Sequence, residues 1–439
     1  MRLNMFKGKT ARTAERTHEG ARAVKLNDEL RLRRTVLSCM LWENEFYEDG
    51  EAISARITLL AEKVAPEAVA ALAIEARTQM NLRHAPLLLL TVLAKTGAKT
   101  EKLVANTVVE VIQRADELSE LVAIYWRNGK VPLSAQLKKG LARAFAKFDA
   151  YQLAKYDRPG PVRLRDVLFL VHAKPKATEQ AEVWRKLAGK ELDSPDTWEV
   201  ALSGGAGRRE TFTRLIGEGK LGYLALLRNL RNMAESGVSE RLVRRAILDR
   251  KGAQRVLPFR FVAAARAAPL FDREIDQALQ AAITDQTALA GRTIVLVDVS
   301  GSMDAQLSRR SDLSRMDAAA SLASVINGDV RIFTFSNEIV EVPARRGLAG
   351  IDAVVQSQPH GGTYLGKAVK HVNGLEHDRL IVITDEQSHD DVRDPAAPRA
   401  YMINVASARN GVGYGKWVHF DGFSEHVLRY IAEYEREFG

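Results

Sequence analysis

The sequence predicts a multidomain protein in which an all-α helical-repeat part precedes an α/β part with a doubly wound, Rossmann-like sheet. Over residues 28–290 the apolar pattern is almost wholly helical, with no convincing strand. Residues 293–297 and 380–384 are unbroken apolar runs, which is typical of strands buried on both faces of a parallel sheet. We therefore expect a flexible basic arm over residues 1–25, a helical module over 26–288 and an α/β domain over 289–439.

Segments of helical length follow one another in pairs within the first part. A single pair of helices cannot bury its own apolar face. The pairs are therefore expected to stack into an α-solenoid of the HEAT type. No clean sequence repeat is present, and this prediction therefore depends on the apolar pattern alone. The expected pairs are 53–64 with 67–80, 85–94 with 101–112, and 118–125 with 134–148. Later helices are expected over 165–171, 221–233 and 241–249.

Length and composition describe a chain with ample residues for large buried cores. The 439 residues suit two or three domains, and 46% hydrophobic with 27% charged residues is ordinary for a soluble protein. No apolar run approaches the roughly 18 to 20 residues of a membrane span. The first residues are basic, but the apolar core of a secretory signal does not follow them. A single cysteine, Cys39, excludes an internal disulfide framework, and its apolar neighbours predict a core position. These features lead us to expect a cytoplasmic protein.

The net charge of +9 is distributed unevenly along the chain. Residues 1–290 carry 48 Lys and Arg against 35 Asp and Glu, whereas residues 291–439 carry 16 against 20. A basic first part joined to an acidic second part indicates that the first part meets a polyanion. The alternative is a surface of solvated lysines with no such partner.

Oxygen-bearing side chains follow the first apolar run at alternate positions: Asp298, Ser300 and Ser302. Such ligands on a loop that leaves the carboxyl end of a buried strand suit a hard cation such as Mg²⁺. A third hydroxyl, Thr363, precedes a helix-like run, and Asp385 ends the second apolar run. The alternative is a turn in which the two serines only cap the following helix.

No set of catalytic residues is evident in the sequence. Residues 361–367 nearly match a phosphate loop, but alanine occupies the position after Lys367 and no buried strand precedes the loop. The nine histidines show no zinc-binding spacing, and no serine or cysteine lies in a nucleophile turn. We therefore expect a binding protein and not an enzyme.

The expected helix over residues 134–148 has an apolar stripe on one side and cations on the other. Backbone phosphates of a nucleic acid would select this arrangement, although any solvated helix of a basic protein can show it. The cations on this helix, which are candidates for binding RNA, are Lys138, Lys139, Arg143 and Lys147.

Further candidate RNA-binding residues lie downstream. Lys155 ends one expected helix, and His172 and Lys174 follow the next. A histidine beside lysines at a helix end can donate to a phosphate or stack on a base, although a lone histidine is more often structural. Arg228 and Arg231 share a face of the expected helix over residues 221–233.

The DxSxS motif at 298–302, followed by the threonine at 363 and the acid at 385, resembles a von Willebrand factor A domain with a metal-ion-dependent adhesion site. The resemblance implies that Ser300, Ser302 and Thr363 bind a divalent ion, expected to be Mg²⁺, directly. It implies that Asp298 and Asp385 bind the ion directly or through water.

The segments LKKGLARAFAKFDAYQLAKYD, RLRDVLFLVHAKP, YLALLRNLRNM and LPFRFVAAAR resemble the TROVE module of the Ro autoantigen family. A TROVE module followed by a von Willebrand A domain is the Ro architecture. The resemblance implies a monomeric ring of HEAT-like helices that binds small noncoding (Y-like) RNA and takes 3′ ends of misfolded RNA into its hole. It implies exoribonuclease partners in RNA quality control or decay. By the same resemblance, Lys139, Lys155 and His172 fall on the RNA-facing surface.

Two other classes of function stay open at this point. In one, a partner's carboxylate completes the shell of the ion, and the chain is an adhesion-like protein-binding scaffold without RNA. In the other, the ion serves hydrolysis of phosphodiesters. The excess of positive charge in the helical part favours RNA binding over both.

Overall fold

The computed structural model describes residues 12–38, 41, 49–97, 99–253, 256, 258–284, 288–307, 313–343, 345–406, 408–422, 427–428, 431–432 and 434–435. The chain divides into two compact units: residues 27–42 with 49–196, and residues 1–26, 43–48 and 197–439. Cys39, expected in the core, and residues 1–11 of the expected arm lie outside the described residues. Among the helices of the described part, none has the length and apolar character needed to span a bilayer.

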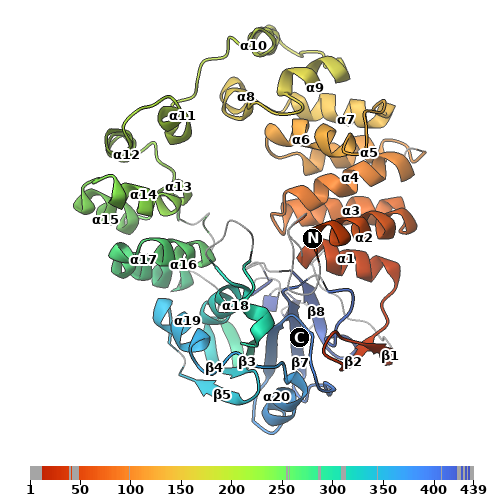
Figure 1. Cartoon of the computed structure of the whole chain (residues 1–439), viewed down its shortest axis with the longest axis vertical. Helices are drawn as coiled ribbons and strands as arrows, with labels where there is room; N and C mark the ends of the chain where they lie inside the picture. Colours follow the sequence, from red (N-terminus) through yellow and green to blue (C-terminus); the bar gives the residue numbers. More distant parts are fainter. Residues whose placement is uncertain are drawn as a thin grey trace. The chain divides into compact units, whose positions relative to one another are not determined.

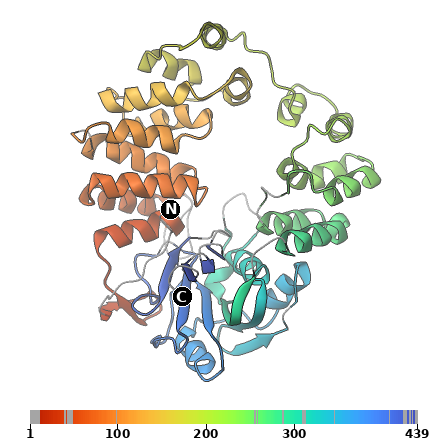
Figure 2. The same cartoon turned by 180° about the vertical axis from the view of Figure 1, so that it is seen from behind.

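The unit of residues 27–42 and 49–196 is helical throughout its described part (Figure 1). Its odd-numbered helices up to α9 pack in succession, and α2, α4 and α6 form a second layer against them; Figure 2 shows the same two layers from behind. This is the predicted solenoid of stacked helix pairs. The helices are α1 (Asp28–Ser38), α2 (Gly50–Lys63), α3 (Pro66–Thr78), α4 (His84–Thr96), α5 (Leu103–Val111), α6 (Asp116–Tyr125), α7 (Ala135–Phe145), α8 (Ala150–Tyr156), α9 (Leu164–Val171) and α10 (Thr178–Gly189).

The contact between α5 and α7 depends on a glycine. The hydroxyl of Ser134 caps α7 by accepting a hydrogen bond from the backbone N–H of Leu137 at 3.3 Å. One turn later, a Cβ atom at Gly140 would lie 2.8 Å from Cβ of Val108 and 2.9 Å from the carbonyl oxygen of Ala105. The absence of a side chain at residue 140 therefore lets the two helices approach closely.

Buried ion pairs join successive helix pairs of this unit. Glu117 is fully buried and accepts from the guanidinium of Arg77 at 2.7 Å, and Asp116 accepts from Arg83 at 2.6 Å. Arg83 also contacts Glu120, whose pKa is raised to about 7 because burial outweighs the attraction of the guanidinium.

In the described part of the second unit, helices α11 to α17 precede the sheet. The helix expected over residues 221–233 is interrupted at Asn229, where the chain divides into α13 and α14. The side chain of Asn229 is buried and donates to the carbonyl of Ala225 at 2.9 Å, which stabilises this break. The helices are α11 (Trp198–Ser203), α12 (Arg208–Gly217), α13 (Tyr223–Arg228), α14 (Leu230–Glu235), α15 (Glu240–Leu248), α16 (Pro258–Ala267) and α17 (Asp272–Thr284).

A six-stranded sheet completes the second unit, with strand order β5-β4-β3-β6-β7-β8. All neighbouring strands are parallel except the edge strand β5, which is antiparallel to β4. Its strands are β3 (Leu289–Asp298), β4 (Gly328–Phe335), β5 (Ile339–Val342), β6 (Arg379–Thr384), β7 (Arg399–Asn404) and β8 (Val418–Asp421). Its helices are α18 (Arg315–Ser324), α19 (Leu348–Val355) and α20 (Leu365–Val372).

Both faces of the sheet are buried, as the unbroken apolar runs predict. Val295 and Val297 of β3 pack with residues of α18 and α19 on one face. Ile294 and Leu296 pack with Leu365 and other residues of α20 on the opposite face. The predicted doubly wound α/β fold is therefore confirmed.

Helices α16 and α17 pack directly against this α/β part. Arg266 of α16 forms an ion pair with Asp352 of α19, and the backbone N–H of Leu348 donates to the carboxylate of Asp276 in α17 at 2.8 Å. The expected boundary at residue 288 thus separates the helices from the sheet. The border between the two compact units, however, falls after residue 196.

The described part of the expected basic arm is a small β-hairpin of β1 (Arg12–Arg16) and β2 (Arg22–Val24). Its turn is attached to the loop that follows β6. The hydroxyl of Thr17 donates to the carbonyl of Ser388 at 2.8 Å, and the backbone N–H of Ala21 donates to the same carbonyl at 3.1 Å. The prediction of a flexible arm is therefore corrected for residues 12–24.

Candidate metal centre and nucleic-acid interface

The two predicted carboxylates lie at the carboxyl ends of adjacent parallel strands. Asp298 is the last residue of β3, and Asp385 directly follows β6. The chain order reverses at β3, because β4 pairs on one side of it and β6 on the other. Such a switch point leaves a crevice beyond the strand ends where ligands bind in open α/β sheets. Both side chains are fully buried.

The loop after β3 presents the two predicted serine hydroxyls beside Asp298. The backbone N–H of Ser300 donates to Oδ1 of Asp298 at 2.9 Å, which turns the chain back over the carboxylate. The hydroxyl oxygens of Ser300 and Ser302 lie 3.3 Å apart. The 3₁₀ helix η3 (Gly301–Asp304) follows, but neither serine side chain caps it. The structure thus gathers these three residues at the end of β3.

Backbone hydrogen bonds hold Thr363 between the loops that follow β3 and β6. The N–H of Gly301 donates to the carbonyl of Gly361 at 2.9 Å, and the N–H of His389 donates to the carbonyl of Thr363 at 2.8 Å. Thr363 is itself buried. Segments that are about 60 residues apart in the chain therefore meet at this edge of the sheet, as the motif predicts.

The electrostatics of the site favour a bound cation. Burial, and then the nearby charge of Asp385, raise the pKa of Asp298 to about 7. Oδ2 of Asp385 is buried without a hydrogen-bond partner. A divalent cation would stabilise both carboxylates and use this oxygen, and the neighbouring hydroxyls are the hard oxygen ligands that Mg²⁺ prefers. The residues present therefore fit the ion that the motif implies. Among the described residues no group of three or more His, Cys, Asp or Glu could hold a metal, so the predicted centre depends on two carboxylates and neighbouring hydroxyls.

Two residues that support this site were not identified from the sequence. The hydroxyl of Thr384 donates to Oδ2 of Asp298 at 2.5 Å, so β6 orients the carboxylate at the end of β3. The ring of His389 stacks on Tyr364, accepts from the N–H of Thr363 at 3.1 Å and lies 2.9 Å from the carboxylate of Glu19. The position of Thr384 directly before Asp385 was a usable sequence signal. The contact of His389 with Glu19 joins distant segments of the chain, and the sequence carries no signal for it.

Most predicted RNA-binding residues fall on α7, α8 and the end of α9, within one compact unit. Lys139, His172 and Lys174 are exposed, and Lys138 and Lys155 are half-buried. His172 ends α9 in a left-handed backbone conformation, with φ of 51°. The structure therefore collects these cations on consecutive helices.

Two cations of α7 and its end have partners within the protein. The guanidinium of Arg143 donates to the side chain of Asn106 at 2.8 Å. The ammonium of Lys147 donates to the carbonyls of Val109 and Ile112, at 2.8 and 2.6 Å. Burial lowers the pKa of Lys147. Lys147 thus satisfies carbonyls at the end of α5, and this structural use was missed because only its helical face was considered.

The remaining two RNA-binding candidates lie in the other compact unit. Arg228 ends α13 and Arg231 lies in α14, so they do not share one continuous helix as predicted. Both are exposed, and Arg231 donates to the carbonyl of Ala267 at 3.0 Å.

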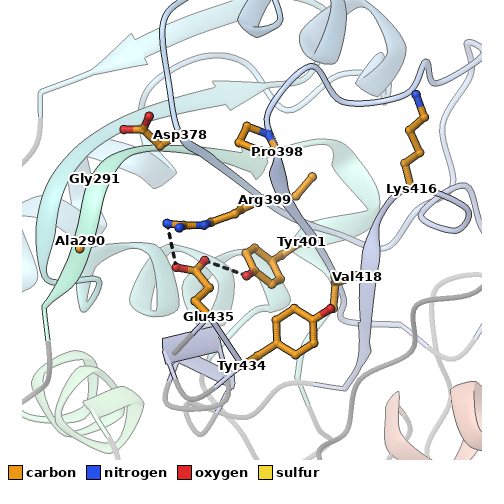
Figure 3. Close-up of a pocket in the computed structure, with 11 residues that line it drawn as sticks. Ala290, Gly291, Asp378, Pro398, Arg399, Tyr401, Lys416, Val418, Tyr434 and Glu435 are labelled. Atoms are coloured by element: carbon orange, nitrogen blue, oxygen red, sulfur yellow. Dashed lines mark hydrogen bonds and ion pairs between the residues drawn. The ribbon is translucent and has the colours of Figure 1, made fainter. Parts of the chain in front are cut away.

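A cavity of about 460 Å³ lies at the opposite edge of the sheet, at the amino ends of β3, β6 and β7 (Figure 3). Glu435 points into it and accepts from the hydroxyl of Tyr401 at 2.7 Å, and it pairs with Arg399 at 3.4 Å. These polar groups satisfy one another, and the cavity contributes nothing to the metal centre.

Comparisons with known proteins agree with the predicted resemblance. Residues 178–282 match the TROVE domain family. The crystal structure of the Deinococcus radiodurans Ro (RSR) protein is similar with a TM-score of 0.64 at 17% sequence identity, over 93% of this chain and 100% of that chain. No curated protein matches the sequence.

The fold defines a class of protein in which stacked helix pairs precede a doubly wound α/β domain. Residues 178–282 thus match the TROVE family that the resemblance names, and the chain shares the fold of a Ro protein.

Proposed function

We propose that this chain is an RNA-binding protein of the Ro type whose cationic surface on α7 to α9 contacts RNA phosphates. The observation that carries the proposal is the gathering of Lys139, Lys155, His172 and Lys174 on consecutive helices of a basic chain. Contacts of this kind give affinity with little sequence preference.

The RNA class is proposed from the resemblance alone. By analogy with the Ro family, the RNAs are a small noncoding Y-like RNA and the 3′ ends of misfolded RNA. An exoribonuclease partner and a role in RNA quality control or decay in the cytoplasm follow from the same analogy. We propose that the chain itself binds RNA and does not cleave it, because the sequence shows no recognisable set of catalytic residues.

We further propose that Asp298, Ser300, Ser302, Thr363 and Asp385 hold a divalent ion, Mg²⁺ by ligand type. The buried, unpartnered oxygen of Asp385 supports this assignment. When bound, the ion would offset the repulsion between two carboxylates and leave a coordination position for an acidic group of a partner.

The proposed function is tested by the nucleic acid that the protein carries. Chain purified without nuclease is expected to absorb more strongly at 260 nm than its aromatic residues account for, and ribonuclease should remove the excess. A preparation free of nucleic acid that also fails to shift labelled RNA would contradict RNA binding. Labelled RNA that is shortened on incubation with the pure protein and Mg²⁺ would show an enzyme instead.

The capture of 3′ ends requires its own comparison. A linear RNA with a single-stranded 3′ end should bind more tightly than the same RNA closed into a circle, because a hole admits ends and not closed loops. Equal affinity of the two forms would remove the 3′-end part of the proposal and leave phosphate binding on the helices.

A further inference from the structure

The two most exposed aromatic side chains of the described residues lie on consecutive helices of the cationic surface. The side chain of Phe169 in α9 is 62% exposed, and that of Tyr151 in α8 is 52% exposed. Both helices pack against α10. Large aromatic rings normally contribute to cores, so two open rings among proposed phosphate-binding residues indicate a binding use.

The ring of Tyr151 is accompanied by a cation. The ammonium of Lys155 lies 5.8 Å from the ring centre of Tyr151 and 5.9 Å from that of Tyr156. The guanidinium of Arg114 lies 4.7 Å from the centre of the Tyr156 ring. Within the described part of the chain, Lys155 forms no ion pair, so its charge is available to a ligand beside the open ring.

Two groups that can bind phosphate follow Phe169 along the chain at the end of α9. The left-handed conformation of His172 ends the helix one turn after Phe169, and the exposed Lys174 follows in the departing chain. An open ring is thus followed at once by two groups that can bind phosphate.

Two nearby acidic groups cap helices, and burial raises the pKa of a third, Asp157. Asp149 accepts from the backbone N–H of Gln152 at 2.7 Å and caps α8. Asp166 accepts from the backbone N–H of Arg163 at 2.9 Å at the start of α9. The ligand favoured by open rings beside available cations is therefore one that offers flat faces and negative charge together.

We infer that Tyr151 and Phe169 are base-stacking residues for single-stranded RNA, with the phosphates bound by Lys155, His172 and Lys174. Every unpaired base has a face that can stack on an aromatic ring, whereas the bases of a duplex are covered by their neighbours. The inference rests on the proposed RNA-binding function and adds to it: the surface selects unpaired nucleotides. Base stacking and phosphate binding then differ in their dependence on salt.

The test compares alanine variants of the two rings with variants that keep an aromatic ring. Tyr151→Ala and Phe169→Ala should each bind a fluorescent single-stranded RNA of about 12 nucleotides at least about fivefold more weakly. Tyr151→Phe and Phe169→Trp should bind like the parent. The slope of log affinity against log salt should stay unchanged in all four variants, because no phosphate contact is removed.

The matched control is Leu59→Ala, which removes an apolar side chain of 59% exposure from α2 in the same compact unit. It should bind single-stranded RNA like the parent. A blunt duplex of the same sequence should bind all variants equally, because its bases are not free to stack. Thermal unfolding of each variant establishes that the fold is retained.

The outcomes separate this inference from the function it rests on. If the alanine variants bind the single strand like the parent while Lys155→Ala reduces the salt slope, stacking is wrong and RNA binding stands. If the parent binds no RNA, both fail. If the alanine variants change only the state of association of the protein, the open rings are a protein contact and the inference is overturned.

Discussion

The hydroxyl of Thr384 donates a hydrogen bond to the carboxylate of Asp298 across adjacent strands, at 2.5 Å. The bond leaves Oδ1 of Asp298 to accept from the backbone N–H of Ser300 and fixes the plane of the carboxylate. Because Asp385 is the next residue after Thr384, strand β6 both orients one carboxylate of the site and supplies the other. The predicted metal centre thus depends on the pairing of β3 with β6.

Replacing Asp298 by Ala is expected to abolish divalent-ion binding and leave a folded α/β domain, because the change also removes the repulsion between buried carboxylates. Calorimetric titration of Mg²⁺ into parent and variant measures this. Asp329→Ala is the control, since this exposed carboxylate lies at the start of β4, away from the predicted ligands. RNA affinity should change by less than about 1 kcal/mol. If the parent takes up no divalent ion, the predicted metal centre is wrong.

Gly140→Ala is expected to destabilise the helical unit although alanine favours helices. The added methyl would meet Val108 and the carbonyl of Ala105 at under 3 Å. Overpacking of this kind costs about 1 to 3 kcal/mol, which exceeds the roughly 1 kcal/mol gained in helix propensity.

Thermal unfolding followed by circular dichroism measures this effect. Gly160→Ala is the control in the same unit, because its methyl would have only an ordinary contact at 3.7 Å. A Gly140→Ala variant as stable as the parent would show that α5 and α7 can separate at little cost.

The pKa of Glu120 predicts a pH dependence of stability. Burial raises the pKa of Glu120 in the folded chain to about 7, above its value in the unfolded chain. Its stabilising contribution is therefore complete at pH values below the unfolded pKa and is lost as pH rises through about 7.

A Glu120→Gln variant should lack this loss and exceed the parent in stability at pH 8 by about 1 kcal/mol, after allowance for solvent screening. Burial lowers the pKa of neighbouring His84 from its ordinary value. The titration of His84 therefore falls below that of Glu120. Chemical denaturation of both proteins at pH 5 and pH 8 measures the difference. A parent and variant that respond equally to pH would show that Glu120 stays ionised beside Arg83.

The sheet and its site were predictable because their signals are local. Residues 293–297 are buried on both sides, so the apolar run is unbroken, and the loop after it carries three predicted ligands within five residues. The helix with Lys139 was predictable for the same reason, since one stripe of it is buried and the other side is exposed.

Two of the misses are long-range contacts that have no local signal. Residues 12–24 are mostly polar or small, and their hydrogen bonds reach Ser388 across more than 360 residues of chain. Lys147 lies on the expected face, yet its long side chain reaches the carbonyls of α5. The helix over 221–233 has continuous apolar spacing, and only the buried amide of Asn229 explains its interruption.

The proposal that RNA phosphates bind along α7 to α9 is tested most directly by the salt dependence of RNA affinity in three proteins. The parent should lose affinity linearly in log salt, and Lys139→Ala with Lys155→Ala should reduce the slope by about 0.7 for each lost contact with a single strand. Lys147→Ala should keep the parent slope, because that ammonium is bound to carbonyls of α5. A parent affinity independent of salt, or a double variant with the parent slope, would contradict RNA binding on this surface.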